Sequence, residues 1–402
     1  MTLTFEQARA CVLREVPAPA LNEAGIESVA LAEADHRVLA EEIRADRDYP
    51  PFPRSARDGF AIRAADVPGE LRVIGEVRAG QSFPGSVGQG EALEIMTGAP
   101  VPDGADAVVM IEHTTREGSA VKVGRFAKGG DNITPTGEEA RAGVVVLQAE
   151  TPLGYAEIAL LAMVGCARVR VFRRPRVAIL PTGDEIVEAG EQHLGPAQIR
   201  NSNAAALAAQ VRRAGGVPEV LPIARDNYES TSALVSRGLD ADLLLLSGGV
   251  SAGKYDIVER VLADAGAEFF FDSVLIQPGK PVVFGRVCRE SVTKFVFGLP
   301  GNPASTMVTF ELFARAAIER MQGVMHPPLR LLRAKLTREF RHKPGLTRFL
   351  PARLSADGST VEPEPWKGSG DVAALARANA FLVAEPDRES WAAGEDIRVL
   401  LK

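Results

Sequence analysis

The spacing of apolar residues divides the chain into segments with different periodicity. Apolar residues recur at helical spacing in residues 1–48, whereas residues 49–140 consist of short strand-like runs separated by proline and glycine. Residues 141–172 return to mixed strand and helix patterns that resemble the first segment. We therefore expect a β-rich domain, 49–140, to be inserted into a discontinuous helical and β domain formed by 1–48 and 141–172.

Strand and helix patterns alternate in residues 173–324. The run of leucines at 243–246 is typical of a strand buried on both faces. Strand patterns also occupy 176–181, 219–223, 268–276 and 294–299, and helical patterns occupy 203–214, 229–237, 257–265 and 304–321. This alternation predicts a doubly wound, largely parallel α/β domain.

Residues 325–402 return to short strands and turns after the proline pair at 327 and 328, which predicts a small C-terminal β-barrel-like domain. The fold class expected for the whole chain is therefore multidomain, α/β plus β.

The start of the chain has the pattern of an amphipathic helix rather than of a signal peptide. Thr4 and Gln7 have the spacing of a capping box, and no stretch of the chain approaches 18 uninterrupted apolar residues. The three cysteines are odd in number and far apart, so they predict neither a disulfide framework nor a zinc site. We expect a cytoplasmic protein.

The charge balance argues against binding to polyanions. The 402 residues carry a formal net charge of −6, which is unsuited to bulk attraction to nucleic acid or anionic lipid. The arginine run between Arg168 and Arg176 is interpreted as a solvated strand edge at a domain junction. We therefore expect neither nucleic-acid nor membrane partners.

Four loops of the α/β domain follow predicted strands and are rich in glycine and polar residues. They span 182–185, 247–254, 277–281 and 298–305. Ligands of doubly wound sheets bind beyond the carboxyl ends of the strands, and glycines let the backbone approach a ligand closely. Lys254 and Lys280 add positive charge. Each loop alone is equally consistent with a plain tight turn, but four at one edge favour a small molecule that carries phosphate or another oxyanion.

One of these loops partly matches a nucleotide-binding pattern. Residues 248–254 fit the first seven places of GxxxxGK[ST], but Tyr255 stands where the small hydroxyl residue is needed to coordinate magnesium. The pattern therefore argues against a P-loop NTPase.

The acidic residues of this domain have two interpretations. Asp226 and Asp256 each precede a predicted helix and have a glutamate three places on, which is typical of a helix N-cap with a capping-box partner. The pair Asp184 and Glu185 stands where another helix is expected to begin. The alternative is a site for a hard cation, because Mg²⁺ prefers carboxylates shared with substrate phosphates.

Seven motifs, taken in order, resemble the MoeA family, the molybdopterin molybdenumtransferases related to the C-terminal domain of gephyrin. They are SARDGFA (55–61), IMTGAPVPDGAD (95–106), PTGDE (181–185), NSN (201–203), SGGVSAGKYD (247–256), QPGKP (277–281) and GLPGNPAS (298–305). On spacing alone the first two are surface turns. The ordered set covers nearly the whole chain and is far more specific than any single loop.

The resemblance implies an enzyme of molybdenum cofactor biosynthesis. In the family reaction, adenylylated molybdopterin, molybdate and a divalent cation, usually Mg²⁺, yield the molybdenum-loaded dithiolene and AMP. The α/β domain would be similar to the molybdopterin-adenylating proteins (MogA/MoaB-like). The protein would be a homodimer, held by the discontinuous domain, with each active cleft completed by the partner subunit's inserted domain. Further expected partners are a molybdopterin adenylyltransferase and molybdoenzyme chaperones.

The motifs also carry residue roles over from the family. Asp58 and Thr97 would be catalytic residues that face the partner subunit's cleft. Lys280, also expected to be catalytic, would hold pterin and phosphate groups. The expected ligands of the cation are Glu185, Asp226 and Asp256, which also surround the scissile bond. The expected pterin- and phosphate-binding residues are Gly183, Asp184, Ser247, Gly248, Gly249, Ser251, Gly253, Pro278, Gly279, Pro300, Gly301, Asn302 and, near molybdate, Ser369.

Five positions depart from the family pattern: Thr134, Glu139, Gln277, Leu346 and Pro351. Gln277 removes a positive charge from the expected anion site, and the last two replace arginines of the C-terminal domain. These lost charges motivate a different hypothesis, a non-catalytic paralogue that binds pterin or scaffolds delivery. A third hypothesis is adenylation of molybdopterin by the α/β domain.

Overall fold

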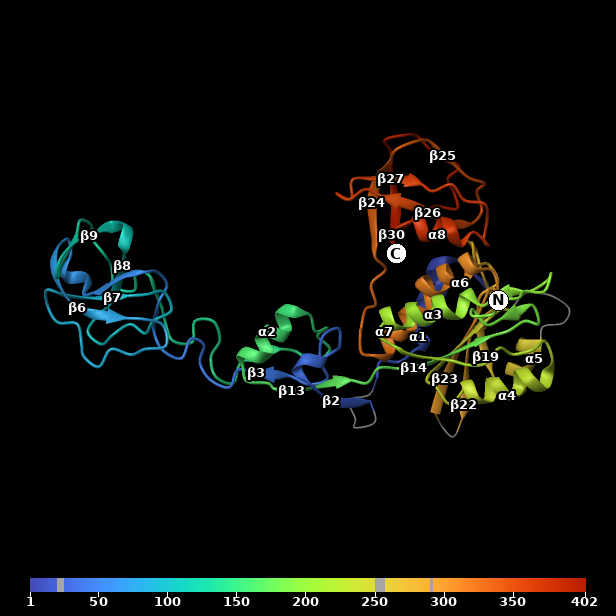
Figure 1. The fold of residues 1–402 in the computed structure, drawn as a ribbon, viewed down its shortest axis with the longest axis horizontal. Helices are drawn as coiled ribbons and strands as arrows, with labels where there is room; N and C mark the ends of the chain where they lie inside the picture. The colour runs from blue at the N-terminus through green and yellow to red at the C-terminus, as the bar shows by residue number, and fades with distance from the viewer. Residues whose placement is uncertain (20–24, 250–256, 290–291) are drawn as a thin grey trace.

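The computed structural model describes residues 1–19, 25–249, 257–289 and 292–402, which form an elongated, multidomain molecule (Figure 1). The inserted β domain lies at one end, the α/β domain and the C-terminal domain lie at the other, and the discontinuous domain lies between them. Three residues of the expected site, Ser251, Gly253 and Asp256, lie outside the described ranges.

The α/β domain is built on a six-stranded sheet. Its order is β17 (Val217–Val220), β14 (Arg176–Pro181), β18 (Leu243–Ser247), β23 (Val292–Leu299), β22 (Val283–Arg289) and β19 (Glu268–Phe271). The first four strands pair in parallel, and β22 runs antiparallel to both of its neighbours. The predicted doubly wound, largely parallel sheet is confirmed.

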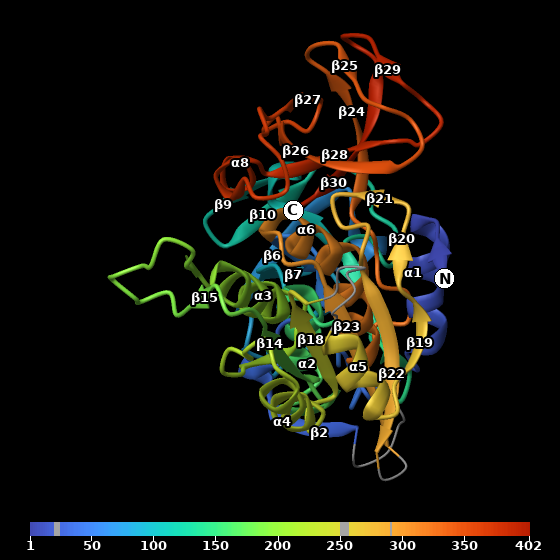
Figure 2. The same ribbon diagram turned by 90° about the vertical axis from the view of Figure 1, so that its right-hand side faces the viewer.

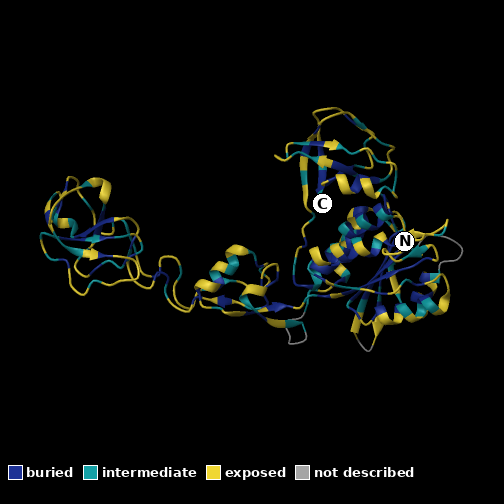
Figure 3. Cartoon of the chain, in the orientation of Figure 1, coloured by how far each residue is buried: buried dark blue, intermediate teal, exposed yellow. Residues whose placement is uncertain are grey.

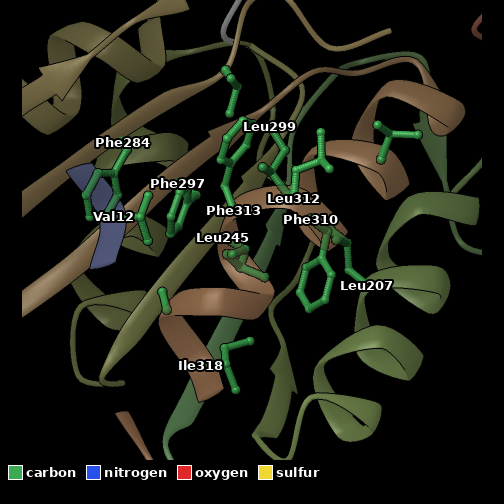
Figure 4. Close-up of a cluster of buried hydrophobic side chains, with 14 of the residues drawn as sticks. Val12, Leu207, Leu245, Phe284, Phe297, Leu299, Phe310, Leu312, Phe313 and Ile318 are labelled. Carbon is green, nitrogen blue, oxygen red and sulfur yellow. The ribbon is translucent and has the colours of Figure 1, made fainter. Parts of the chain in front are cut away.

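Helices cover both faces of this sheet because successive residues of its buried strands point to opposite faces. Leu243 and Leu245 of β18 join one apolar cluster, and Leu244 and Leu246 join another. The first cluster receives α1 (Phe5–Glu15), α3 (Ser202–Arg213), α6 (Pro303–Thr309), the π-helical turn η4 (Phe310–Ala314) and α7 (Arg315–Met321). The second receives α4 (Tyr228–Gly238) and α5 (Ile257–Asp264). Figure 4 shows the first cluster, where aromatic rings of β22, β23 and η4 meet Val12 of α1.

The N-terminal segment belongs physically to this domain. β1 (Thr2–Leu3) pairs in parallel with β20 (Ser273–Val274), and α1 begins at the predicted capping box, in which Thr4 and Gln7 exchange side-chain to backbone hydrogen bonds. We expected residues 1–48 to lie together with 141–172, but β1 and α1 pack on the α/β domain. The apolar face of α1 is covered there by residues more than 250 positions away.

The discontinuous domain lies around one small apolar core. β2 (Ile26–Ala30) pairs with β13 (Arg168–Phe172), and β3 (Ile43–Arg44) pairs with β12 (Val145–Leu147). α2 (Tyr155–Met163) covers them, so residues from both sides of the insertion share the core. The link to the inserted domain is a pair of antiparallel segments, in which β4 (Arg54–Ser55) pairs with β11 (Ile133–Thr134).

The inserted domain is a six-stranded sheet with apolar clusters on both faces. Its order is β8 (Ala107–Met110), β5 (Gly59–Ile62), β7 (Glu91–Ile95), β6 (Gly69–Val77), β10 (Ala120–Val123) and β9 (Thr114–Glu117). The predicted β-rich character of this segment is confirmed.

The C-terminal domain is a closed barrel, as the sequence predicts. Its strands are β26 (Thr347–Leu354), β27 (Thr360–Pro363), β24 (Leu331–Leu336), β30 (Asp396–Leu401) and β28 (Ala380–Ala384), and β28 pairs back onto β26. Smaller elements are β25 (Phe340–Arg341), α8 (Val372–Arg377) and β29 (Ser390–Trp391). β21 (Ile276–Gln277) adds to the barrel through β26, so the pattern at 268–276 is three short strands in three different sheets rather than one strand.

Burial follows this organisation (Figure 3). The inner strands β14 and β18 are almost wholly buried, whereas the edge strand β17 and the helix α2 present exposed residues. In the ranges that the structure describes, no helix is long and apolar enough to cross a membrane.

Candidate functional site

A cleft of about 930 Å³ opens at the carboxyl ends of β14, β18 and β23. Nine of the residues expected in the site line it: Gly183, Glu185, Asp226, Ser247, Gly248, Gly249, Pro300, Gly301 and Asn302. These residues come from four separate loops. The cleft therefore lies where the strand order of a doubly wound sheet predicts ligand binding.

The loop after β18 can take its course only because it contains glycine. Gly248 and Gly249 have φ values of 100° and 65°, which are left-handed conformations that side chains rarely adopt. A Cβ atom on Gly248 would lie 2.9 Å from the carbonyl oxygen of Thr182, and one on Gly249 would lie 2.7 Å from a methyl group of Val258. The two glycines thus keep the floor of the cleft open beside β14 and α5.

Asp226 is not a helix cap. The N-cap of α4 is Asn227, whose side-chain oxygen accepts a hydrogen bond from the Ser230 N–H at 2.9 Å. The Asp226 carboxylate instead accepts from the Asp184 N–H at 3.3 Å, and the Asp226 N–H donates to the Asp184 carboxylate at 3.2 Å. The capping interpretation of Asp226 is therefore wrong, and its carboxylate lies at the cleft wall.

No helix begins at Asp184 or Glu185 either. The chain there forms the short strand β15 (Ile186–Val187), which pairs with β16 (Ile199–Arg200) in the segment that protrudes beside α3 (Figure 2). Glu185 consequently has no capping role, and it lines the cleft with Asp226. Asp256, which precedes α5, lies outside the described residues.

Two carboxylates at the cleft wall suit a hard cation, because Mg²⁺ takes one or two protein carboxylates together with water and substrate oxygens. Over the described ranges, no group of three or more histidine, cysteine or acidic side chains gathers as a preformed metal site. The residues present therefore fit a cation that is shared with a substrate phosphate.

The loop at 277–281 contributes less of the cleft wall than its motif suggests. Only Pro281 of this loop lines the cleft, whereas Pro278, Gly279 and Lys280 do not. Gly279 has φ +105°, and a Cβ atom there would collide with the methyl group of Thr309 in α6. The glycine thus allows the loop to lie directly on α6.

Ser369 lies beside the cleft loop that precedes α6. Its carbonyl oxygen accepts a hydrogen bond from the Ala304 N–H at 2.9 Å, in the first turn of α6. The turn of the C-terminal domain that holds Ser369 therefore docks next to Asn302, which lines the cleft.

Asp58 and Thr97 are brought together, but not with the cleft of their own chain. Asp58 precedes β5 and Thr97 follows β7, and both strands lie in the domain at the far end of the molecule from α3 and β14 (Figure 1). The Asp58 carboxylate accepts from the Thr97 N–H at 2.6 Å and from its hydroxyl at 2.9 Å. These two hydrogen bonds, the backbone one first, hold the pKa of Asp58 below its usual range.

Two of the positions that depart from the family pattern lie in the link to the inserted domain. Glu139 forms an ion pair with Arg54 there, and Thr134 pairs with Arg54 across β4 and β11. Gln277 stands opposite Arg348 where β21 joins the barrel. Glu139 is thus engaged in an ion pair within the link.

Sequence reasoning assigned no role to several residues of the cleft wall. These are Pro181, Thr182, Ile186, Ile199, Arg200, Asn201, Ser202, Asn203, Thr231, Ile257, Val258, Pro281 and Pro303. Arg200 donates two hydrogen bonds to the Glu191 carbonyl, at 2.9 and 2.6 Å, within the protruding segment. The sequence feature that could have identified three of them is the polar tripeptide at 201–203, where α3 begins.

Three family models together match most of the chain. Residues 3–165 match the MoeA N-terminal region (domain I and II), residues 178–320 match a probable molybdopterin binding domain, and residues 333–402 match the MoeA C-terminal region (domain IV).

Similar proteins cover nearly its full length. A molybdopterin molybdenumtransferase of Staphylococcus aureus (strain COL) is 33% identical over 384 residues, which is 93% of this chain and 90% of that protein. One from Staphylococcus epidermidis (strain ATCC 12228) is 34% identical with the same coverage.

Two solved structures of a molybdopterin biosynthesis MoeA protein from Pyrococcus horikoshii are also similar. One aligns with a TM-score of 0.78 at 33% identity and covers 100% of this chain and 99% of that chain. The other aligns with a TM-score of 0.80 at 30% identity, with full coverage of both chains.

Proposed function

The chain belongs to the MoeA family of molybdopterin molybdenumtransferases, which act in molybdenum cofactor biosynthesis, and on this basis we propose its reaction in detail. The proposed reaction is the Mg²⁺-dependent insertion of molybdate into adenylylated molybdopterin with release of AMP. The observation that carries the proposal is the pair of carboxylates, Glu185 and Asp226, at the wall of a cleft edged by glycine-rich loops. Neither carboxylate caps a helix.

The roles proposed for the described residues follow from their chemistry. Glu185 and Asp226 would hold the cation together with Asp256, and bound Mg²⁺ would offset the negative charge that develops as the phosphoanhydride is cleaved. Gly248, Gly249 and Gly301 let the main chain approach the pterin and phosphate groups. Holding the substrate in one orientation lowers the entropic part of the barrier.

Ser369 is expected near molybdate, and Lys280 is expected to hold the pterin and phosphate groups of the substrate. Ser369 is docked at the start of α6, beside the cleft loop. Lys280 adjoins Pro281, which lines the cleft. We propose that Ser369 contacts the incoming molybdate and that Lys280 binds a pterin or phosphate group of the substrate.

A homodimer is the proposed assembly, because the site is incomplete in one chain. The inserted domain, which carries Asp58 and Thr97, lies at the opposite end of the molecule from β14 and α3, which border the cleft (Figure 1). In the proposed assembly a second copy therefore brings its inserted domain to the cleft. The helix α2 offers a surface for such a copy. It is apolar throughout except for Glu157, yet Leu161 is its only buried residue, and Tyr155 is 91% exposed.

The test is a reconstituted reaction. Purified protein is incubated with adenylylated molybdopterin, molybdate and Mg²⁺, and AMP and molybdenum cofactor are quantified. We expect molybdate-dependent AMP release that is lost in the Glu185→Ala variant while its thermal unfolding is unchanged. AMP formation no faster than in a protein-free control would refute the reaction. Tight pterin binding without turnover would instead favour the scaffolding hypothesis, and ATP consumption with free molybdopterin would favour the adenylyltransferase.

The cytoplasmic location and the transient partners, a molybdopterin adenylyltransferase and molybdoenzyme chaperones, remain predictions from the sequence resemblance. Co-purification of the tagged protein with either class of partner would test them.

A further inference from the structure

Two loops of the cleft are tied together by a single side chain. Asn203, in the first turn of α3, donates from Nδ2 to the Ser247 hydroxyl oxygen at 2.9 Å and to the Gly301 carbonyl oxygen at 2.8 Å. Ser247 ends β18 and Gly301 follows β23, so one amide group joins the carboxyl ends of two parallel strands. All three residues line the cleft.

The orientation of this amide group follows from its partners. A carbonyl oxygen can only accept, so the Asn203 atom that faces Gly301 has to be the NH₂ group. The same NH₂ group faces Ser247, whose hydroxyl oxygen therefore acts as the acceptor. Ser247 is only 4% exposed, and its own hydroxyl proton has no acceptor among the described residues.

We propose that Asn203 is a positioning residue for the substrate. It would fix the Ser247 hydroxyl with its proton turned toward the cleft, and it would lock the loops at 247–249 and 300–302 at one separation. Ser247 would then donate to an acceptor oxygen of the bound pterin nucleotide, either a phosphate oxygen or a pterin carbonyl. The identity of this ligand rests on the proposed function.

The first test addresses the locking of the two loops and needs no ligand. Asn203→Leu keeps the size and branching of the side chain but removes both donors. We expect faster amide hydrogen exchange in the 247–249 and 300–302 loops of this variant, while exchange in the inserted domain is unchanged. Ala209→Asn places the same amide on the exposed face of α3 and serves as the control, with no expected change. Unchanged exchange in both loops of Asn203→Leu would overturn the locking role.

The second test is a double-mutant cycle on binding of adenylylated molybdopterin, measured without molybdate and Mg²⁺ so that no turnover occurs. Loss of one hydrogen bond to the ligand is expected to weaken binding about tenfold in Ser247→Ala and similarly in Asn203→Leu. If Asn203 acts through Ser247, the double variant is weakened no more than about twofold beyond either single variant.

The outcomes separate this inference from the proposed reaction. If the two effects multiply, the double variant binds the ligand about a hundredfold more weakly than the wild type. That result would assign Asn203 a role independent of Ser247 and overturn the proposal. A wild-type protein that binds the ligand without releasing AMP would refute the reaction, yet the binding cycle would still decide the role of Asn203. A wild-type protein that does not bind the ligand would overturn the donor role of Ser247.

Discussion

Asp58 accepts two hydrogen bonds from Thr97 through one carboxylate oxygen, from the backbone N–H at 2.6 Å and from the hydroxyl at 2.9 Å. Both bonds favour the ionised carboxylate, which is why the pKa of Asp58 is lowered. A carboxylate whose folded pKa is depressed contributes stability above its unfolded pKa, and this contribution is lost as pH falls through the folded value. The pair thus keeps one negative charge fixed on the surface of the inserted domain.

Thr97→Ala is expected to raise the pKa of Asp58 toward its ordinary value, because the hydroxyl donor is lost. The titration can be followed by carboxyl ¹³C NMR of aspartate-labelled protein, with Asp58→Asn to assign the signal. Thr97→Ser retains the hydroxyl and should leave the pKa lowered. An equal pKa in the alanine and serine variants would contradict the role of the hydroxyl.

Two inactive variants are expected to complement each other. In a heterodimer of Asp58→Ala and Asp226→Ala subunits, one cleft combines an intact Asp226 with an intact inserted domain from its partner. Random pairing of equal amounts makes half of the dimers mixed, so about one quarter of the wild-type AMP release should return. Co-expressed subunits with different tags allow the mixed dimer to be isolated and assayed. A mixed dimer without activity would mean that each cleft draws both residues from one chain.

The exposed face of α2 is expected to hold the two subunits together. Tyr155, Ala159 and Met163 recur at helical spacing on this face and are exposed in the single chain. Ala159→Glu should shift the protein to monomers in analytical ultracentrifugation, because a charge would be desolvated in an apolar interface. Ala209→Glu, on the exposed face of α3, is the matched control. A fully dimeric Ala159→Glu protein would place the interface elsewhere.

Substitutions at the neighbouring residues Asp226 and Asn227 are expected to have separate effects on activity and stability. Asn227→Ala removes the side-chain cap of α4 and should lower the free energy of unfolding by about 1 kcal/mol, with AMP release retained. Asp226→Asn should do the reverse, with stability unchanged in urea titrations and AMP release lost. If Asp226→Asn destabilises the protein as much as Asn227→Ala does, the carboxylate has a structural role.

Gly279→Ala is expected to destabilise the protein by on the order of 3 kcal/mol, because the residue has positive φ and the new methyl group meets Thr309. Thr309→Ser removes the methyl group that collides but keeps the hydroxyl that bonds to the Ser305 carbonyl. The double variant should therefore recover part of the loss in urea titrations. Strict additivity of the two changes would show that backbone strain alone accounts for the cost.

The parts of the fold that follow from local patterns were predictable. The leucine run of β18 predicted a strand buried on both faces, and the Thr4 capping box predicted the start of α1. Pairings between distant segments were not predictable in this way. The pairing of β1 with β20 and the placement of β21 in the barrel depend on partners that no local periodicity identifies.

Prediction of the candidate site from the sequence was limited in the same way, at the level of single residues. The sequence identified the loops, because four loops rich in glycine and polar residues follow predicted strands at one edge of the sheet. It did not show whether Asp226 or Asn227 caps α4. Both side chains can cap a helix, and a shift of one residue in the start of the helix changes which of them does so. It also gave Asn203 no role, because its two partners lie 44 and 98 residues further along the chain.

The packing of α1 on the α/β domain also has a consequence for folding during synthesis. Arg9 of this helix bonds to the carbonyl of Leu312, which is 303 residues further along the chain. At about 5–20 residues per second, translation reaches that position on the order of 15–60 s after α1 has been synthesised. During that interval the helix lacks Phe313, which meets the ring of Phe5, and all of α7, against which α1 packs. Burial of α1 is thus complete only after most of the chain has been synthesised, and the nascent chain has to remain soluble until then.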